Sequence, residues 1–352
     1  MLSMTAKERV LKLLAGEQVD RIACYSGMGN VTVSGLQEYG YKFPLVHSDA
    51  TQMANCAASS YRLFGYECAV VPFDMCVEAE ALGCKMNAYE NVDQLLYPTI
   101  KEKTVHAPED MAKVTVPANL AEQGRLPIVT ESLRLLKADV GDEVAIGAWV
   151  LGPFTLAGQI MDLNDLFKLA FKSPAQVNTM LDTLADMLIS VVDMYKKAGA
   201  DYICVREMGA TSDILSPRSF KKVIYPHLKK IFDHIEHPNI LHICGSTNKV
   251  IKDMHECGAD AISVEIKNDL AQTRADIGWE PLVFGNIDAY NVLVNGTPEI
   301  VKTAVLECIE GGVDAVWPSC DIWPDAPLAN LKAMVETVQE YGAAKWVRKQ
   351  KG

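Results

Sequence analysis

Gly199-Ala200-Asp201-Tyr202 joins a helix-like stretch to an apolar run, and junctions of this kind occur four times in the chain. Glycine suits the left-handed residue just past a helix C-terminus, and the apolar run after it suits a strand buried on both faces of a parallel sheet. The repetition predicts successive helix-to-strand units. The other three junctions are Gly65-Tyr66-Glu67-Cys68, Gly258-Ala259-Asp260-Ala261 and Gly312-Val313-Asp314-Ala315.

Eight candidate strands result when four further apolar runs bounded by turn signals are added to these junctions. Eight strands separated by helices predict a closed (β/α)₈ TIM barrel of the α/β class. An open doubly wound sheet is the alternative, although no glycine fingerprint for a dinucleotide follows the first strand. The 352 residues suit one barrel domain over 1–352. The four further runs are Ile22 to Tyr25, Val144 to Trp149, Asn239 to His242 and Leu282 to Gly285.

Two segments extend the predicted barrel. Thr5 and Glu8 form a capping-box pattern that predicts an N-terminal helix, with Gly16 at its end. Residues 78–140, between the second and third strands, are polar and punctuated by prolines. We expect this stretch to be an insertion near the barrel mouth, either a lid or a brace.

Composition excludes several classes of protein. The formal net charge of -12 argues against a nucleic-acid partner, because phosphate binding needs clustered Lys and Arg. No stretch approaches the roughly 20 apolar residues that span a bilayer, and the N-terminus lacks a secretion signal. We therefore expect a cytoplasmic protein whose ten cysteines are reduced.

The strongest chemical signal is His242-Ile243-Cys244-Gly245, at the end of an apolar run. Strand alternation sends His242 and Cys244 to the same side, and imidazole with thiolate is a donor pair that Zn²⁺ prefers. Cys320, at the end of the eighth candidate strand, is the predicted third ligand because the strands curve around a barrel. Three protein ligands leave one coordination position open, as in catalytic zinc sites. The alternative is a buried His beside a buried Cys.

Other polar and aromatic residues follow the predicted strands, where catalytic groups of barrels gather. Glu265 is a candidate fourth ligand or general base, or else a solvated strand end. Trp149 would form an apolar wall or pack in the core, and Arg206 would bind a charged substrate group or pair with Glu207. The remaining candidates for substrate binding are Asp74, Asn286 and Tyr25.

These residues lie in motifs through which the chain resembles the uroporphyrinogen decarboxylase superfamily, and within it the methylcobamide:coenzyme M methyltransferases. The resemblance runs nearly end to end. It implies a barrel whose zinc is held by His242, Cys244 and Cys320, with Glu265 completing the shell when substrate is absent. The motifs are KERVLKLLAGEQVDRI (7–22), VPFDMCVEAEALGC (71–84), GPFTLAG (152–158), HICG (242–245), SVE (263–265), GNID (285–288) and NGTPEIV (295–301).

Within this superfamily the resemblance implies methyl transfer, from a methylated corrinoid on a separate corrinoid protein to a zinc-activated thiol such as coenzyme M. The porphyrin decarboxylases carry an arginine-rich segment after the first strand, whereas this chain has Tyr25-Ser26-Gly27-Met28-Gly29-Asn30. That difference disfavours decarboxylation, even though Asp74 matches an acidic residue of the decarboxylases. A metal-independent decarboxylase remains the alternative of a different class.

The chain also departs from the coenzyme M enzymes. After the fourth strand it has Arg206-Glu207-Met208, where those enzymes usually carry a neutral or acidic segment. After the last cysteine it has Asp321-Ile322-Trp323-Pro324-Asp325, where they tend to be small and neutral. Both stretches would face the pocket, so the acceptor is open, with tetrahydrofolate as the alternative to a thiol. A homodimer is compatible with the sequence.

Overall fold

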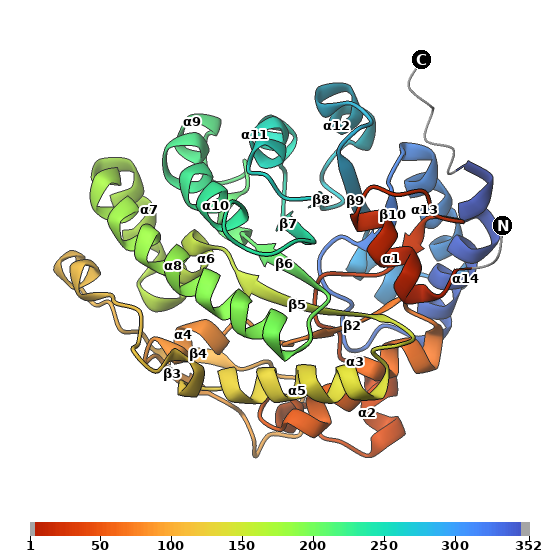
Figure 1. Ribbon diagram of the computed structural model, residues 1–352, viewed down its shortest axis with the longest axis horizontal. Helices are drawn as coiled ribbons and strands as arrows, with labels where there is room; N and C mark the ends of the chain where they lie inside the picture. The colour runs from red at the N-terminus through yellow and green to blue at the C-terminus, as the bar shows by residue number, and fades with distance from the viewer. Residues whose placement is uncertain (1–3, 346–352) are drawn as a thin grey trace.

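A computed structural model describes residues 4–345 and contains the eight predicted parallel strands in one curled sheet (Figure 1). Its strand order is β1-β10-β9-β8-β7-β6-β5-β2. The strands are β1 (Ala23–Cys24), β2 (Cys68–Val71), β5 (Ala145–Leu151), β6 (Tyr202–Arg206), β7 (Asn239–Ile243), β8 (Ala261–Val264), β9 (Leu282–Ile287) and β10 (Ala315–Pro318).

The two ends of this sheet meet at Glu67, which precedes β2. Its backbone N–H donates to the Cys24 carbonyl at 3.1 Å, and its Oε2 accepts from the Cys24 N–H at 2.8 Å. Arg9 and Arg21 both pair with the Glu67 carboxylate, so the N-terminal segment reinforces the closure. The predicted (β/α)₈ barrel is therefore confirmed, and the open doubly wound alternative is wrong.

Helices surround the sheet, as Figure 1 shows. The predicted capping box is present at α1, where Thr5 accepts from the Glu8 N–H and the Glu8 side chain accepts from the Thr5 N–H. The α-helices are α1 (Ala6–Leu14), α2 (Val33–Tyr39), α3 (Ala50–Phe64), α4 (Val77–Ala81), α5 (Leu126–Asp139), α6 (Pro153–Ile160), α7 (Leu163–Lys172), α8 (Pro174–Ala198), α9 (Pro217–Ser219), α10 (Tyr225–Phe232), α11 (Ile251–Glu256), α12 (Leu270–Ile277), α13 (Pro298–Gly311) and α14 (Leu328–Lys345).

Shorter helical turns connect these elements. Among the described residues, five are 3₁₀ helices, η1 (Phe43–His47), η2 (Pro108–Lys113), η3 (Leu120–Glu122), η4 (Met208–Ala210) and η6 (Asn248–Val250), and two are π-helices, η5 (Phe220–Ile224) and η7 (Ala289–Val294). No helix within residues 4–345 is long and apolar enough to cross a bilayer.

The segment predicted as an insertion, 78–140, divides into two parts. Its first part carries the antiparallel hairpin of β3 (Lys85–Asn87) and β4 (Thr99–Glu102), which lies outside the barrel sheet. Its last part is α5, which packs against α3 and α8 as a barrel helix. This last part of the polar stretch is therefore a barrel helix and not an insertion, because its charged residues are exposed while Val129, Leu133 and Leu136 are buried.

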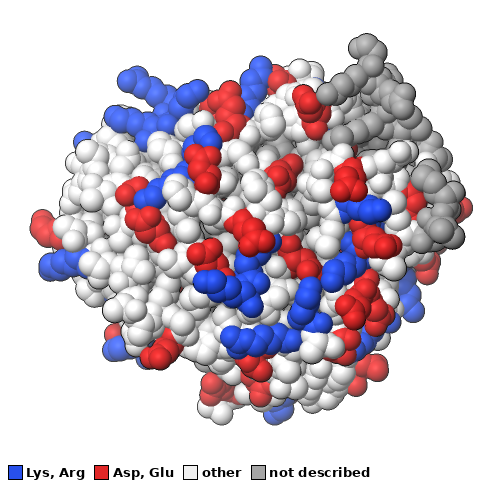
Figure 2. All heavy atoms as spheres, viewed as in Figure 1, with Lys and Arg blue, Asp and Glu red and all other residues white. Residues whose placement is uncertain are grey.

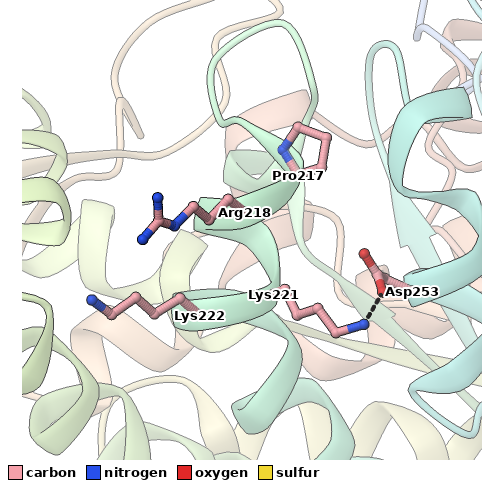
Figure 3. Close-up of a pocket in the computed structure, with 5 residues that line it drawn as sticks. All are labelled: Pro217, Arg218, Lys221, Lys222 and Asp253. Carbon is pink, nitrogen blue, oxygen red and sulfur yellow. Dashed lines mark hydrogen bonds and ion pairs between the residues drawn. The ribbon is translucent and has the colours of Figure 1, made fainter.

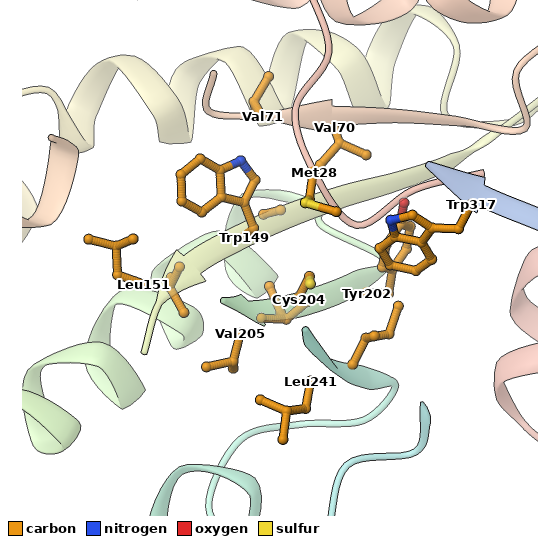
Figure 4. Close-up of a cluster of buried hydrophobic side chains, with 14 of the residues drawn as sticks. Met28, Val70, Val71, Trp149, Leu151, Tyr202, Cys204, Val205, Leu241 and Trp317 are labelled. Atoms are coloured by element: carbon orange, nitrogen blue, oxygen red, sulfur yellow. The ribbon is translucent and has the colours of Figure 1, made fainter. Parts of the chain in front are cut away.

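The barrel interior is packed with large side chains from many strands (Figure 4). Trp149 and Trp317, from β5 and β10, are both almost completely buried. Such packing makes the barrel a solid scaffold whose strand ends hold functional groups in place. On the outside, acidic and basic side chains lie beside one another over most of the face seen in Figure 2.

Candidate metal centre and its surroundings

His242 lies on β7, opposite Ser263 on β8 in the strand register. The Ser263 Oγ is 3.0 Å from His242 Nδ1, and His242 Nε2 is 3.2 Å from Cys244 Sγ. A hydrogen-bond partner on one ring nitrogen fixes the orientation of the ring and leaves the other nitrogen free to bind a metal. The side chain is fully buried, so this hydrogen bond is not exchanged with solvent.

The chain turns sharply after Cys244, at Gly245, which has a φ of +78°. A Cβ at this position would lie 2.5 Å from Thr211 Oγ1, so both the conformation and the space require glycine. The loop after β6 is tied to this turn, because the Ser212 N–H donates to the Ser246 carbonyl at 2.8 Å. The loop after β6 and the turn after β7 therefore act together to hold Cys244 at the rim of the barrel.

Cys320 follows β10, three strands away from β7 in the sheet order. Its Sγ is 3.4 Å from Cys244 Sγ, and the donor atoms of His242, Cys244 and Cys320 all lie within 4.8 Å of one another. The predicted convergence of three donors from distant parts of the chain is present.

This donor set suits zinc. Bonds of about 2.0–2.3 Å to a tetrahedral Zn²⁺ separate nitrogen and sulfur donors by roughly 3.4–3.8 Å, close to the observed spacing. The hydrogen bond between the sulfurs lowers the pKa of Cys244 and raises that of Cys320. The nearby Arg206 guanidinium acts to lower both pKa values. The pair is thus arranged to yield a first thiolate readily.

Glu265, predicted as a fourth ligand, lies outside the three-donor cluster. Its Oε2 accepts a hydrogen bond from the Gly245 N–H, one residue beyond Cys244. The carboxylate is therefore beside the cluster but engaged with backbone, and its role as a ligand or base stays a prediction.

Arg206 ends β6 and is 98% buried, with its guanidinium 4.6 Å from the centre of the Trp149 ring. One nitrogen, Nη2, donates to Asp321 Oδ2 at 3.0 Å and to Cys320 Sγ at 3.4 Å. Arg206 thus reaches the cluster at Cys320, whereas Trp149 contacts the guanidinium from the barrel interior, and the contact of either residue with substrate stays a prediction. The alternative pairing of Arg206 with Glu207 is wrong.

Glu207 instead anchors the start of α6. Its carboxylate accepts from the Phe154 N–H at 2.9 Å and from the Thr155 N–H at 2.8 Å. Burial raises the pKa of Glu207 to about 7. A Cβ at Gly152 would lie 2.4 Å from Glu207 Oε2, which explains the glycine that opens the GPFTLAG motif.

Asp74, a predicted substrate-binding residue, is engaged by groups of the protein itself, so its contact with substrate stays a prediction. Both carboxylate oxygens are used by protein donors: Arg125 at 2.7 and 2.9 Å, His47 Nδ1 at 2.9 Å and the Cys76 N–H at 3.0 Å. These hydrogen bonds outweigh the effect of burial and hold the pKa of Asp74 well below its usual range. Asp74 therefore ties the start of α5 to the strand end.

Tyr25 and Asn286 both make their contacts within the protein. The Tyr25 ring is fully buried against Tyr202, Phe284 and Trp317, so it belongs to the barrel core. Asn286 Nδ2 donates to the Asn268 carbonyl at 3.1 Å and braces the loop after β8. Neither placement supports the predicted contact with substrate.

Sequence reasoning missed Ser263 as a functional residue. The available signal was a single hydroxyl in the apolar strand Ala261–Val264, placed one strand along from His242.

A separate surface hollow of about 570 Å³ is lined by Pro217, Arg218, Lys221, Lys222 and Asp253 (Figure 3). Lys221 pairs with Asp253 at 3.2 Å, whereas the Arg218 and Lys222 side chains point away from that pair. The hollow includes none of the cluster residues.

Fold and cluster together define a (β/α)₈-barrel protein with a His-Cys-Cys cluster, a candidate metal site, at the carboxyl ends of its strands. Residues 5–341 match the family described as uroporphyrinogen decarboxylase (URO-D). The chain belongs to that family.

Relatives within the family have two kinds of activity in their names. The methylcobamide:CoM methyltransferase MtaA of Methanosarcina barkeri is 31% identical over 344 residues, covering 97% of this chain and 100% of that protein. The uroporphyrinogen decarboxylase of Chlorobaculum tepidum is 25% identical over 300 residues, covering 80% and 82%. A solved methyltransferase from Methanosarcina mazei superposes with a TM-score of 0.91 at 30% identity, covering 96% and 99%.

Proposed function

We propose that this chain is a zinc-dependent methyltransferase that moves a methyl group from a methylated corrinoid, carried by a corrinoid protein, to a thiol. The observation that carries the proposal is the meeting of His242 Nε2, Cys244 Sγ and Cys320 Sγ within 4.8 Å at the barrel rim. The relatives that are 31% identical are named methylcobamide:CoM methyltransferases, which supports both a methylated corrinoid as the methyl donor and methyl transfer as the reaction.

His242, Cys244 and Cys320 would hold the zinc, with Glu265 as the proposed fourth ligand before the acceptor arrives. Zinc bound there would keep the acceptor sulfur as a thiolate at neutral pH, where a free alkyl thiol is mostly protonated. Ser263 fixes the imidazole, and Arg206 places positive charge beside Cys320.

The transfer forms a carbon–sulfur bond and breaks the carbon–cobalt bond of the donor, whose electron pair stays on the cobalt. The proton of the thiol leaves to solvent when the sulfur binds. The protein supplies proximity, because acceptor and donor meet at a rim built on rigid strands.

Decarboxylation is the weaker candidate for this chain. The segment 25–30 after β1 is buried and contains no arginine, and all the oxygens of Asp74 are engaged by protein donors. Neither feature offers a group to a porphyrin carboxylate.

A demethylation assay tests the proposal. Zinc-loaded protein is mixed with methylcobalamin and, separately, with coenzyme M, L-homocysteine and tetrahydrofolate, and loss of the methylated form is followed by absorbance. We expect thiol-dependent demethylation that Cys320→Ser abolishes and Cys84→Ser retains, since Cys84 lies in the insertion away from the cluster. Activity with tetrahydrofolate alone, or activity retained in Cys320→Ser, would contradict the proposal.

A further inference from the structure

The surroundings of Arg206 and Asp321 suggest how the methyl acceptor is selected. Arg206 is buried between the Trp149 ring and the carboxylate of Asp321, and the same Nη2 that reaches Asp321 also reaches Cys320 Sγ. A cation and an anion are therefore fixed side by side next to a proposed metal ligand. An acceptor whose sulfur joined the cluster at Cys320 would lie beside this pair.

Each member of the pair has one buried polar atom that finds no partner within residues 4–345. These atoms are the Arg206 Nε, a donor, and the Asp321 Oδ1, an acceptor. Both atoms are themselves covered, whereas the Asp321 side chain as a whole is 34% exposed, so the pair lies at the edge of the solvent. Buried polar groups of native proteins are almost always satisfied, which marks an unpaired donor and an unpaired acceptor at one place as groups for a ligand.

The charges decide what kind of ligand fits. Asp321 already balances Arg206, so a ligand with only an anionic group would approach Arg206 against the repulsion of the carboxylate. A ligand that carries an anion and a cation satisfies both, because its carboxylate accepts from Arg206 and its ammonium group donates to Asp321. These two groups of the ligand have no net charge together, so the charge balance of Arg206 and Asp321 is unchanged.

We propose that Arg206 and Asp321 select, as methyl acceptor, a thiol that carries both a carboxylate and an ammonium group, that is, an α-amino-acid thiol. This proposal rests on the proposed function, because it names the acceptor of the same site. Trp149 supports the selection by holding the guanidinium over its ring, 4.6 Å from the ring centre, which restricts the directions in which the N–H groups can donate.

Binding measurements on the full zinc-loaded chain test this proposal without turnover. Calorimetry compares L-homocysteine, which has both charged groups, with 4-mercaptobutyrate, which lacks only the ammonium group, and with coenzyme M, which has a sulfonate. We expect L-homocysteine to bind about tenfold more tightly than either, as one additional charged hydrogen bond predicts.

Asp321→Asn is the informative variant and Asp325→Asn its matched control, an exposed aspartate four residues further along the same loop. The preference for L-homocysteine over 4-mercaptobutyrate should fall to about twofold or less in Asp321→Asn and stay near tenfold in Asp325→Asn. If Asp321→Asn does not fold, Arg206→Lys provides the second test. This variant retains the positive charge but loses the planar guanidinium group. The binding of L-homocysteine and of 4-mercaptobutyrate, which both carry a carboxylate, should each become about tenfold weaker.

Zinc-edge X-ray absorption separates the two proposals. If coenzyme M adds a sulfur to the zinc shell but L-homocysteine is not preferred, the acceptor proposal is overturned while the proposed function stands. If no thiol changes the shell, both are overturned. A preference that survives unchanged in Asp321→Asn also overturns the selection by this pair.

Discussion

Ser263 Oγ lies 3.0 Å from Nδ1 of His242, and this single contact decides which nitrogen of the imidazole faces the two sulfurs. Both residues are fully buried on adjacent strands, so the ring cannot take another orientation without losing a buried hydrogen bond. The geometry of the three-donor cluster thus depends on a residue that is not itself one of the proposed ligands.

Replacing Ser263 by Ala should lower zinc affinity by about 10- to 100-fold, the usual effect of losing the outer partner of a metal-binding histidine. Competition with a chromophoric chelator measures this affinity. Ser263→Thr retains the hydroxyl and should bind zinc closer to the wild-type strength. Equal affinities in wild type and Ser263→Ala would show that the hydrogen bond does not position the ring.

The ion pair of Asp74 with Arg125 should contribute strongly to stability, because both side chains are buried. Asp74→Ala leaves an unpaired guanidinium and should cost about 3–5 kcal/mol in the free energy of unfolding. The matched control is Asp139→Ala, which breaks the exposed pair with Arg62 and should cost less than about 1 kcal/mol. Urea denaturation measures both, and equal losses would contradict the assignment.

The low pKa of Asp74 also predicts a pH dependence. A carboxyl group whose pKa is lower in the folded than in the unfolded chain stabilises the fold above its unfolded pKa of about 3.9. That stabilisation is lost as the pH falls below this value. The acid-induced loss of stability below about pH 4 should be smaller in Asp74→Asn than in the wild type, as denaturation at several pH values will show.

Glu78 should make the stability of the fold depend on pH in the opposite direction from Asp74. Burial raises its pKa to about 7, and while Oε1 accepts from the Leu151 N–H at 3.0 Å, Oε2 has no partner among the described residues. The folded chain then holds a proton that the unfolded chain releases above about pH 4.3, so stability falls as the pH rises toward 7. Glu78→Gln should remove up to about 3 kcal/mol of this decline between pH 5 and 8. An unchanged slope in the variant would exclude Glu78 as its cause.

The fold could be predicted from short-range patterns in the sequence. Glycine after a helix and an apolar run after glycine are short-range features, and each predicted junction leads into a barrel strand, for example Gly199 before β6 and Gly312 before β10. Helix α5 escaped the prediction because its neighbouring prolines and polar residues resemble a loop. Its buried stripe is set by packing against α3 and α8.

The metal cluster was predictable in its donors and less so in its surroundings. His242 and Cys244 share a strand end, and Cys320 was inferred from strand curvature. The pairing of Arg206 with Asp321 joins positions 115 residues apart, and the sequence analysis considered only the neighbouring Glu207 as a partner. Only the closed barrel decides between them, because β6 and the end of β10 face each other across its mouth.

The central claim is tested most directly by metal analysis combined with zinc-edge X-ray absorption on the wild type, Cys320→Ser and Cys84→Ser. We expect about one zinc per chain in the wild type and in Cys84→Ser, with one nitrogen and two sulfurs from the protein around it, and loss of the metal in Cys320→Ser. A wild type that binds no zinc when zinc is supplied, or a Cys320→Ser variant with an unchanged zinc shell, would contradict the account.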